Sequence, residues 1–450
     1  MDINFNSPRH KEYKDFQDMY DAHTDTHMIV RKIGDYVDHP YLELGLSREV
    51  ALLYSDLAFG NPINAFTKTT DSDTIIEDLI DDNKLNQLLS EASITQAIKG
   101  GIVLKNYLDN GKSKITFIEP DYYFPTFSPF DKRKILSETI AIPYEENEDT
   151  FLYTETYEPD ETGLYWCITA HYQYKDNKVG KKLNESKVST TIFESPLEYV
   201  PFIRSGSDFW GDSIYKGSVA LYDELNNRVT QISNVLDKHS DPSMWALSSV
   251  FDENNQLNHK GGKVYEVQED VEGKKIGDAP IGYITWDWNP EANFKFIKDI
   301  IMKILYTVSP LTPALYGLDE SSQSTGRALV LKSWRTQCKV FRSYIYWRPA
   351  LQSILFKAQQ LQVNSGELSY APEMPSIELS LNIPMDFFEM AQAEQLKVTS
   401  KTTSRKSAIS RLNPHYSSRE VDDEFADMIA EEAEINNLTF MTDFGSNNGG

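Results

Sequence analysis

Two histidines come closest to a metal-binding arrangement in this 450-residue sequence. His23 and His27 are four positions apart, so on a helix their imidazoles would share one face, as the ligands of a zinc ion can. Asp25 lies between them, but no third ligand is identifiable and the sequence contains no HExxH motif. Surface histidines are the simpler interpretation, and we expect no bound metal.

The other chemical motifs are incomplete. Gly111-Lys112-Ser113 resembles the end of a phosphate-binding loop, but that motif needs a glycine five residues earlier, where this sequence has Asn106. Neither Cys167 nor Cys338 belongs to a CxxC motif, and no GxSxG nucleophile motif occurs. The many carboxylates near aromatic residues would suit a sugar-cleaving cleft, yet no motif singles out a pair. We therefore expect no catalytic residue, no cofactor and no enzymatic activity.

The net charge of the chain limits which partners it can bind. The chain has 44 Lys and Arg residues against 68 Asp and Glu residues, for a formal charge of −24. A protein that binds nucleic acid tightly through its phosphates needs a positive surface charge. A protein past which DNA slides without binding tightly does not. No apolar run approaches the ~18 residues of a membrane-spanning helix, and no signal peptide is visible, so we expect an intracellular protein without a membrane partner.

The patterns along the chain change twice before residue 210. The first hundred residues carry helical spacing, with a break at Gly60-Asn61-Pro62. Asp109-Asn110-Gly111 lies between two apolar runs and predicts a β-hairpin. A β-rich region with polar turns continues to about residue 203.

Two long amphipathic helices are predicted next. In the first, apolar residues recur at steps of 4, 4, 3 and 4, and in the second at steps of 3, 4, 3 and 4, so each series forms one stripe. The two series are Leu221, Leu225, Val229, Ile232 and Leu236, and Phe294, Ile297, Ile301, Ile304 and Val308. Between them, Met244–Phe251, Lys263–Gln268 and Ile281–Trp288 are predicted strands.

A breaker-rich loop at residues 310–325 follows the second helix. A third long helix is expected from about Gly326 toward Leu361, with a kink near Pro349. A short strand at Ile377–Leu381 and a helical C-terminal region complete the prediction. Extended helices that lead to a β tip and back suit a ring subunit, because each stripe can pack against a neighbour's helix.

Several elements resemble the portal proteins of tailed bacteriophages, in particular the group from siphoviruses of Gram-positive bacteria. The similar segments occur in the family's order and together cover roughly residues 45–430. They are the GNPI element at Gly60–Ile63, the strand at Ile118–Pro125, the helix from Leu221 to Asp237, Ser324–Leu329 at the start of the kinked helix, and the segment from Pro384 to Ala408. Thr325 is inserted between the Ser and the Gly of the family's S-G-x-A-L element.

This resemblance implies an α+β portal fold with a wing, a two-helix stem, a small β-containing clip, a long kinked helix and a helical crown. The implied divisions are wing 1–210, stem helices 211–240 and 291–309, clip 241–290, tunnel loop 310–325, kinked helix and wing 326–390, and crown with C-terminal tail 391–450.

The resemblance also implies a function. Portal proteins form a homo-oligomeric ring, commonly a dodecamer, at one capsid vertex, where double-stranded DNA enters during packaging and leaves during ejection. The implied partners are the terminase, head–tail adaptors, and the major capsid and scaffolding proteins. The protein would be a virion component assembled in the host cytoplasm. The alternative is a head–tail connector or adaptor ring with a purely structural role, although a small adaptor does not need paired stem helices.

Three groups of residues carry the expected contacts. In the tunnel loop, Leu311, Leu315, Tyr316 and Leu318 either project into the channel toward the duplex or pack under the kinked helix. On the stem, Arg228, Lys238, Lys295, Lys298 and Lys303 either face DNA or form the solvated side of the helices. In the clip, Tyr265, Tyr283, Trp286 and Trp288 either pack within the clip or between subunits, or dock the terminase or an adaptor.

Overall fold

The computed structural model describes residues 3–22, 41–147, 149–175, 177–206, 208–240, 244–247, 264–267, 281–283, 290–309, 330–366, 369–383, 387–413, 416 and 418–446. The chain divides into two compact units, which are treated separately below. Unit 1 comprises residues 1–20, 48–216 and 310–450, and unit 2 comprises residues 21–47 and 217–309. Both helices and sheets are present, which confirms the expected α+β class.

Helices dominate the beginning of unit 1, as predicted. They are α1 (Pro8–Asp21), α3 (Leu46–Phe59), α4 (Thr70–Asp82) and α5 (Leu85–Lys99). Between α3 and α4, the short strand β1 (Asn64–Phe66) pairs antiparallel with β13 (Ser376–Glu378), which lies more than 300 residues later. The expected strand at Ile377–Leu381 is thus shorter and begins one residue earlier.

The predicted hairpin is present in a three-stranded sheet. Strands β2 (Gly101–Asp109) and β3 (Lys112–Ile118) pair around Asn110 and Gly111, whose φ angles are +49° and +85°. Left-handed backbone of this kind favours asparagine and glycine, which explains the turn. Strand β9 (Leu197–Pro201) adds to the other side of β2, giving the order β3-β2-β9.

A five-stranded antiparallel meander forms the rest of the β-rich region. Its strands are β4 (Tyr123–Phe127), β5 (Ile135–Glu146), β6 (Asp149–Pro159), β7 (Tyr165–Lys175) and β8 (Lys178–Ser189), and they pair in sequence order. The short 3₁₀ helix η1 (Pro120–Tyr122) precedes β4. Tyr123, Ile140 and Tyr157 from this sheet share a core with Val103 and Leu197 of the three-stranded sheet. The two sheets therefore belong to one packed unit.

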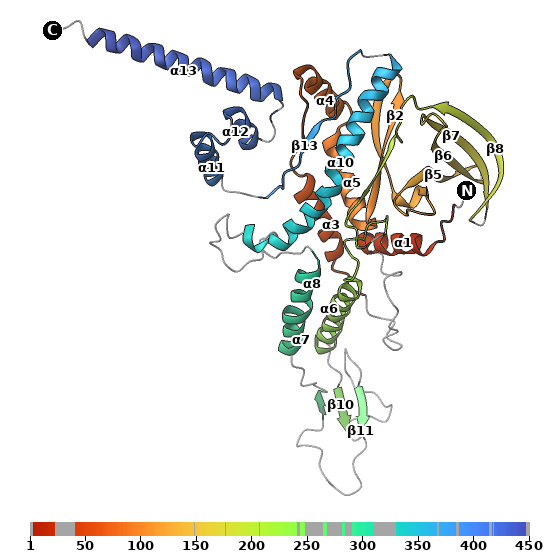
Figure 1. Ribbon diagram of the computed structural model, residues 1–450. Coiled ribbons are helices and arrows are strands. Elements are labelled where there is room, and N and C mark those ends of the chain that lie inside the picture. Colours follow the sequence, from red (N-terminus) through yellow and green to blue (C-terminus); the bar gives the residue numbers. More distant parts are fainter. Residues whose placement is uncertain are drawn as a thin grey trace. The chain divides into compact units, whose positions relative to one another are not determined.

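The long helix α10 (Trp334–Ser365) packs with α5 against the three-stranded sheet (Figure 1). Pro349 lies inside it, and the ribbon bends along its length, as expected for a proline that removes a helical hydrogen bond. Residues 330–332 are also helical. The predicted start at Gly326 lies outside the described residues.

Three helices form the C-terminal region: α11 (Phe387–Thr399), α12 (Arg405–Leu412) and α13 (Ser418–Ser446). Ion pairs join the last two, from Lys406 to Asp422 and from Arg405 to Glu432, each at 2.6 Å. Because α13 continues to Ser446, helix extends into the segment expected as a C-terminal tail.

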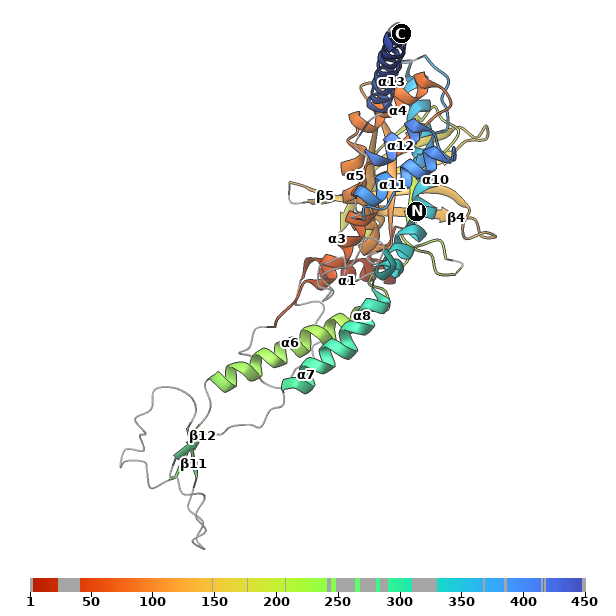
Figure 2. The same cartoon turned by 90° about the vertical axis from the view of Figure 1, so that its left-hand side faces the viewer.

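Unit 2 contains the two predicted long helices side by side (Figure 2). The first is α6 (Val219–Ser240), and the second is a continuous run of α7 (Pro290–Phe296), the π-helical segment η3 (Ile297–Met302) and α8 (Lys303–Val308). The first helix begins later than the expected start of the stem helix at residue 211, because Gly217 adopts a left-handed φ of +85° that a helix cannot continue through.

Between these helices lie three short strands: β10 (Met244–Leu247), β11 (Val264–Val267) and β12 (Ile281–Tyr283). They form a sheet in the order β11-β10-β12, with β11 parallel and β12 antiparallel to β10. Each falls within a segment predicted as a strand. In the part of the chain that is described, no helix has the length and apolar character needed to traverse a lipid bilayer.

Candidate functional site

The two long helices of unit 2 pack through a narrow apolar seam. Tyr222 and Leu225 of α6, with Ile301 of η3 and Leu305 of α8, are buried. At one end of the seam, the Tyr222 hydroxyl and Ser309 Oγ are hydrogen-bonded at 2.9 Å. Burial raises the pKa of Tyr222 to about 12, so this hydroxyl stays protonated at neutral pH. The seam fixes which helix faces remain available to partners.

The predicted single stripe on the second helix is wrong in detail. Ile301 faces the seam, but Phe294, Ile304 and Val308 are exposed, and Leu305 takes the buried position instead. The π-helical segment explains this, because its i→i+5 hydrogen bonds insert an extra residue into the turn and rotate the residues before it relative to those after it. Sequence spacing alone assumes an uninterrupted α-helix and cannot detect this shift.

A second set of apolar side chains is therefore exposed on these two helices. Its members are each 40–55% exposed: Phe294, Ile300, Ile304 and Val308 on the second helix, and Leu236 on α6. Ile300 was not predicted as part of any stripe. Large exposed apolar side chains that are concentrated on a pair of helices in this way are typical of a surface that another protein covers. We refer to these five residues as the stem stripe.

Arg228 is occupied within unit 2. Its Nε donates to Glu224 Oε1 at 2.7 Å, its Nη1 donates to Gln231 Oε1 at 3.2 Å, and its guanidinium lies 5.4 Å from the centre of the Phe296 ring. It thus links α6 to the second helix, a structural role that the sequence pattern did not reveal.

The lysines of the second helix surround one carboxylate. Lys295, Lys298 and Lys303 are exposed, and Lys303 Nζ donates to Asp299 Oδ1 at 2.9 Å. The Lys303 hydrogen bond and charge, with the charges of Lys295 and Lys298, lower the pKa of Asp299. This turn therefore keeps an excess of positive charge at the surface. Lys238 lies in α6, but its side chain is outside the described part of the structure.

The other predicted contact residues are described only partly or not at all. Tyr265 lies in β11 opposite Trp245, and Tyr283 lies in β12 opposite Met244, with no description of their side chains. Outside the described residues are Trp286 and Trp288 of the clip, Leu311, Leu315, Tyr316 and Leu318 of the loop, and His23, Asp25 and His27. The division of the clip aromatics between packing and docking stays open.

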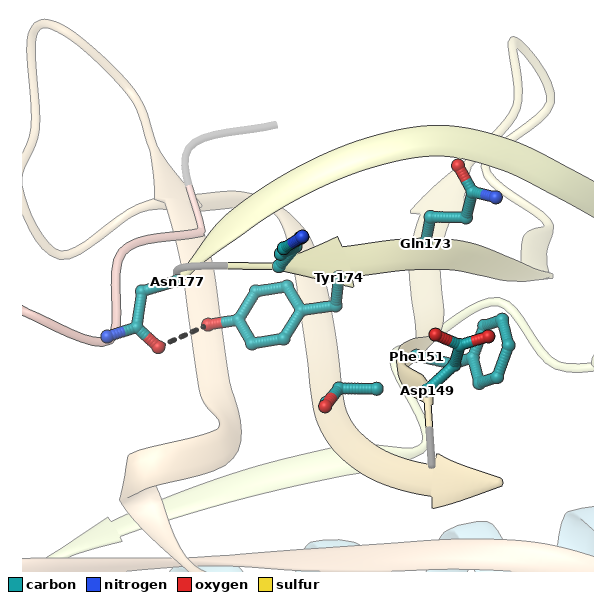
Figure 3. Close-up of a pocket in the computed structure, with 7 residues that line it drawn as sticks. Asp149, Phe151, Gln173, Tyr174 and Asn177 are labelled. Atoms are coloured by element: carbon teal, nitrogen blue, oxygen red, sulfur yellow. Dashed lines mark hydrogen bonds between the residues drawn. The ribbon is translucent and has the colours of Figure 1, made fainter. Parts of the chain in front are cut away.

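Unit 1 contains a hollow of about 710 Å³ at the end of the five-stranded sheet. Residues at the facing ends of β6 and β7 and in the turn beyond β7 line it (Figure 3). The Tyr174 hydroxyl donates to Asn177 Oδ1 at 3.3 Å there. Asp149 is the single carboxylate among the lining residues that are described, whereas glycoside hydrolysis uses a pair. The described residues also contain no cluster of three potential metal ligands. The hollow thus gives no support to the hydrolase alternative.

A further exposed surface, which the sequence patterns did not predict, lies on the first half of α10. Several large apolar and basic side chains are exposed there. A signal was present in the sequence: residues 330–366 contain no aspartate or glutamate. In so acidic a chain, such a gap indicates a surface with its own role.

Comparison with known proteins identifies the family. None of the curated proteins matches the chain. Solved structures that resemble it include two titled as the neck of gene transfer agent (GTA) particles. The native neck, computed with C12 symmetry, has 10% identity and a TM-score of 0.45, and covers 82% of this chain and 89% of the other. The empty neck, computed with C6 symmetry, has 12% identity and a TM-score of 0.46, and covers 82% and 90%.

These structural likenesses are too weak to add to the assignment, which depends on the sequence family. The family described as "Phage portal protein, SPP1 Gp6-like" matches residues 3–437, which is nearly the whole chain. The chain therefore belongs to the SPP1 Gp6-like family of phage portal proteins.

Proposed function

We propose that this protein forms a closed ring at a capsid vertex and serves as a conduit for double-stranded DNA during packaging and ejection. The observation that carries the proposal is the stem stripe, since Phe294, Ile300, Ile304 and Val308 remain exposed beside a seam that is already filled. A ring of identical subunits brings a neighbour's surface to each such stripe. Membership of the portal family supplies the biological setting.

In this proposal the ring is a dodecamer and a non-enzymatic component of the virion, assembled in the host cytoplasm. Residues 211–240 and 291–309 form the stem, residues 241–290 the clip and residues 310–325 the tunnel loop, between the wing and the crown at residues 391–450. The clip docks the terminase and the head–tail adaptor, and the wing and crown meet the major capsid and scaffolding proteins. The portal family and the apolar stripe support this division, and the host group stays a prediction.

DNA contacts are assigned to two places. Leu311, Leu315, Tyr316 and Leu318 of the tunnel loop line the channel, and the lysines around Asp299 provide a modest positive charge on the stem. A wall that DNA slides past should make few phosphate contacts, because each one strengthens binding and steepens its salt dependence.

Mass measurement of the purified chain, with negative-stain microscopy, tests the ring. We expect a closed ring, and a monomer would contradict the proposal. A packaging assay with purified terminase tests the conduit. Leu311→Asp with Leu315→Asp should leave rings intact and reduce packaging. The control is Leu183→Asp with Phe193→Asp, which changes two exposed apolar residues of unit 1 and should affect neither ring formation nor packaging. Normal packaging by the loop variant would exclude Leu311 and Leu315 from the channel wall.

A further inference from the structure

The first half of α10 presents an apolar face that no described part of the chain covers. Its large side chains are 46–68% exposed: Trp334, Phe341 and Ile345 of α10, together with Leu331 of the helical residues 330–332 just before it. At 100° per residue Trp334, Phe341 and Ile345 lie on one side of α10, opposite the buried Thr336 and Ser343. We refer to these four exposed residues as the α10 face.

Arginines flank this face without counter-charges. Arg335, Arg342 and Arg348 are exposed, and none forms an ion pair with any described residue. Burial, together with the charges of Arg335 and Arg342, lowers the pKa of the neighbouring Lys339 to about 8. The three exposed arginines therefore form a positive surface beside the α10 face.

The apolar component selects a protein partner over DNA. Aromatic and arginine side chains together, with few other charges, are the composition of protein–protein interface cores. A duplex presents phosphates and sugars outward, which would pair with the arginines but leave Trp334 and Phe341 without an apolar partner. A protein surface that is both apolar and acidic could pack against the apolar side chains and pair with the arginines.

The chain itself can supply the acidic surface. Residues 330–366 hold six of the 44 Lys and Arg residues and none of the 68 Asp and Glu residues, so the remainder carries 38 basic and 68 acidic side chains. Neighbours in a closed ring meet through two different patches of the same subunit, so a basic patch can face an acidic one. We propose that the α10 face docks on an acidic surface of a second copy of this chain. This inference rests on the proposed ring and adds a contact separate from the stem stripe.

Charge reversal in the full-length chain tests the contact. Arg335→Glu with Arg342→Glu should shift the purified protein from rings to monomers at a concentration where the unaltered chain is fully assembled. Lys178→Glu with Lys181→Glu is the matched control, because it makes the same charge change on the exposed strand β8 and should keep the rings. Leu331→Ser with Ile345→Ser should also release monomers without any change of charge. Circular dichroism and thermal melting should show that the released monomers are folded.

Cys338 gives an independent readout, because it lies one turn from Trp334 and Phe341 on α10 and is partly exposed. In a Cys167→Ser background, a thiol-linked benzophenone at Cys338 should yield covalent dimers on irradiation. Mass spectrometry should map the crosslink to a carboxylate-rich segment.

The outcomes separate this inference from the proposed function. An unaltered chain that is monomeric would remove the ring itself. If the unaltered chain forms rings, and rings also persist in both α10 variants with only intramolecular crosslinks, the α10 contact is wrong while the ring stands. If Arg335→Glu/Arg342→Glu kept intact rings but packaged less DNA, a second copy of the chain would not be the partner of the α10 face, and the face would be assigned to DNA.

Discussion

The two units of this portal protein differ in how far each can bury its own apolar surface. Unit 1 encloses Tyr54, Leu89, Leu104 and Trp347, which are almost fully buried, between helices and two sheets. Unit 2 has one seam between two helices, and the stem stripe beside it is exposed. Burial of apolar surface is the main favourable contribution to folding. Unit 1 can therefore be stable alone, whereas unit 2 would gain much of its stability from neighbours in the proposed ring.

The two units also differ in whether the polar contacts compared here are buried or exposed. In unit 1, the Trp347 indole donates to Gln96 Oε1 at 2.8 Å, and the Tyr54 hydroxyl lies 2.9 Å from the same oxygen. All three side chains are buried, so α3, α5 and α10 share one satisfied network. In unit 2, the ion pair between Lys303 and Asp299 is exposed to solvent. Such pairs contribute little to stability.

The largest expected effect is at Trp347. Replacing it with alanine leaves a cavity and removes the donor to Gln96, so unit 1 should lose about 3–5 kcal/mol of unfolding free energy. Urea unfolding monitored by hydrogen exchange in peptides from α5 and α10 measures the loss. Trp334→Ala is the matched control, because Trp334 is exposed on the same helix and its loss should change the stability of the monomer by less than about 0.5 kcal/mol. Equal effects of the two variants would contradict the self-sufficient core assigned to unit 1.

Adjacent residues on the second stem helix test unit 2. Leu305→Ala removes a seam residue and should destabilise the helix pair by about 2–5 kcal/mol, even in a monomer. Ile304→Ala removes a stem-stripe residue, so it should leave the monomer almost unchanged and weaken the ring. Hydrogen exchange of α6 and α8 measures the first effect, and the ring-to-monomer ratio at several concentrations measures the second. If Ile304→Ala destabilised the monomer as much as Leu305→Ala, the stripe would belong to the fold and not to an interface.

Much of the fold could be predicted from sequence because local chemistry specifies it. Asn110-Gly111 permits the left-handed turn that closes the hairpin, and the apolar spacing after residue 219 specifies α6. The π-helical segment could not be predicted, because one inserted residue per turn leaves no distinct mark in a pattern of apolar residues. That one feature determines whether Leu305 or Ile304 faces the seam.

The candidate site was harder to predict than the fold. Arg228 was expected among the charges that face DNA or solvent. Its bond to Glu224 is local to α6, but its position over Phe296 depends on the packing of two helices far apart in sequence. The arginines of α10 were overlooked because helical periodicity describes which residues are buried and not which exposed ones lack partners. Charge pairing is a tertiary property, and only the acid-free run from residue 330 to 366 indicated it.

The smallest predicted effect concerns a partly buried carboxylate in unit 1. The Glu155 carboxylate accepts hydrogen bonds from Lys105, from Tyr153 at 2.8 Å and from Tyr157 at 2.9 Å, and so joins the two sheets. Burial alone raises the pKa of Glu155, but the charge and hydrogen bond of Lys105 and the bonds from the two tyrosines outweigh it, so the pKa is lowered from 4.5. A lowered pKa in the folded state stabilises the fold above pH 4.5, and this contribution is lost as the pH falls through the folded-state value.

Glu155→Gln should therefore cost unit 1 about 1.5–3 kcal/mol at pH 7, because a hydrogen-bonded charge is lost and Lys105 keeps its own. The difference from the unaltered chain should shrink on acidification below pH 4.5, where the glutamate contribution also disappears. Urea unfolding at several pH values, followed by hydrogen exchange in β6 and β7, measures both effects. Asp299→Asn makes the same chemical change on the exposed helix of unit 2 and should change exchange in α7 and α8 much less than Glu155→Gln changes exchange in β6 and β7. A pH-independent loss of unfolding free energy in Glu155→Gln would contradict this prediction. An equal loss in Asp299→Asn would also contradict it, because the two units would then not differ in how their charged groups stabilise the fold.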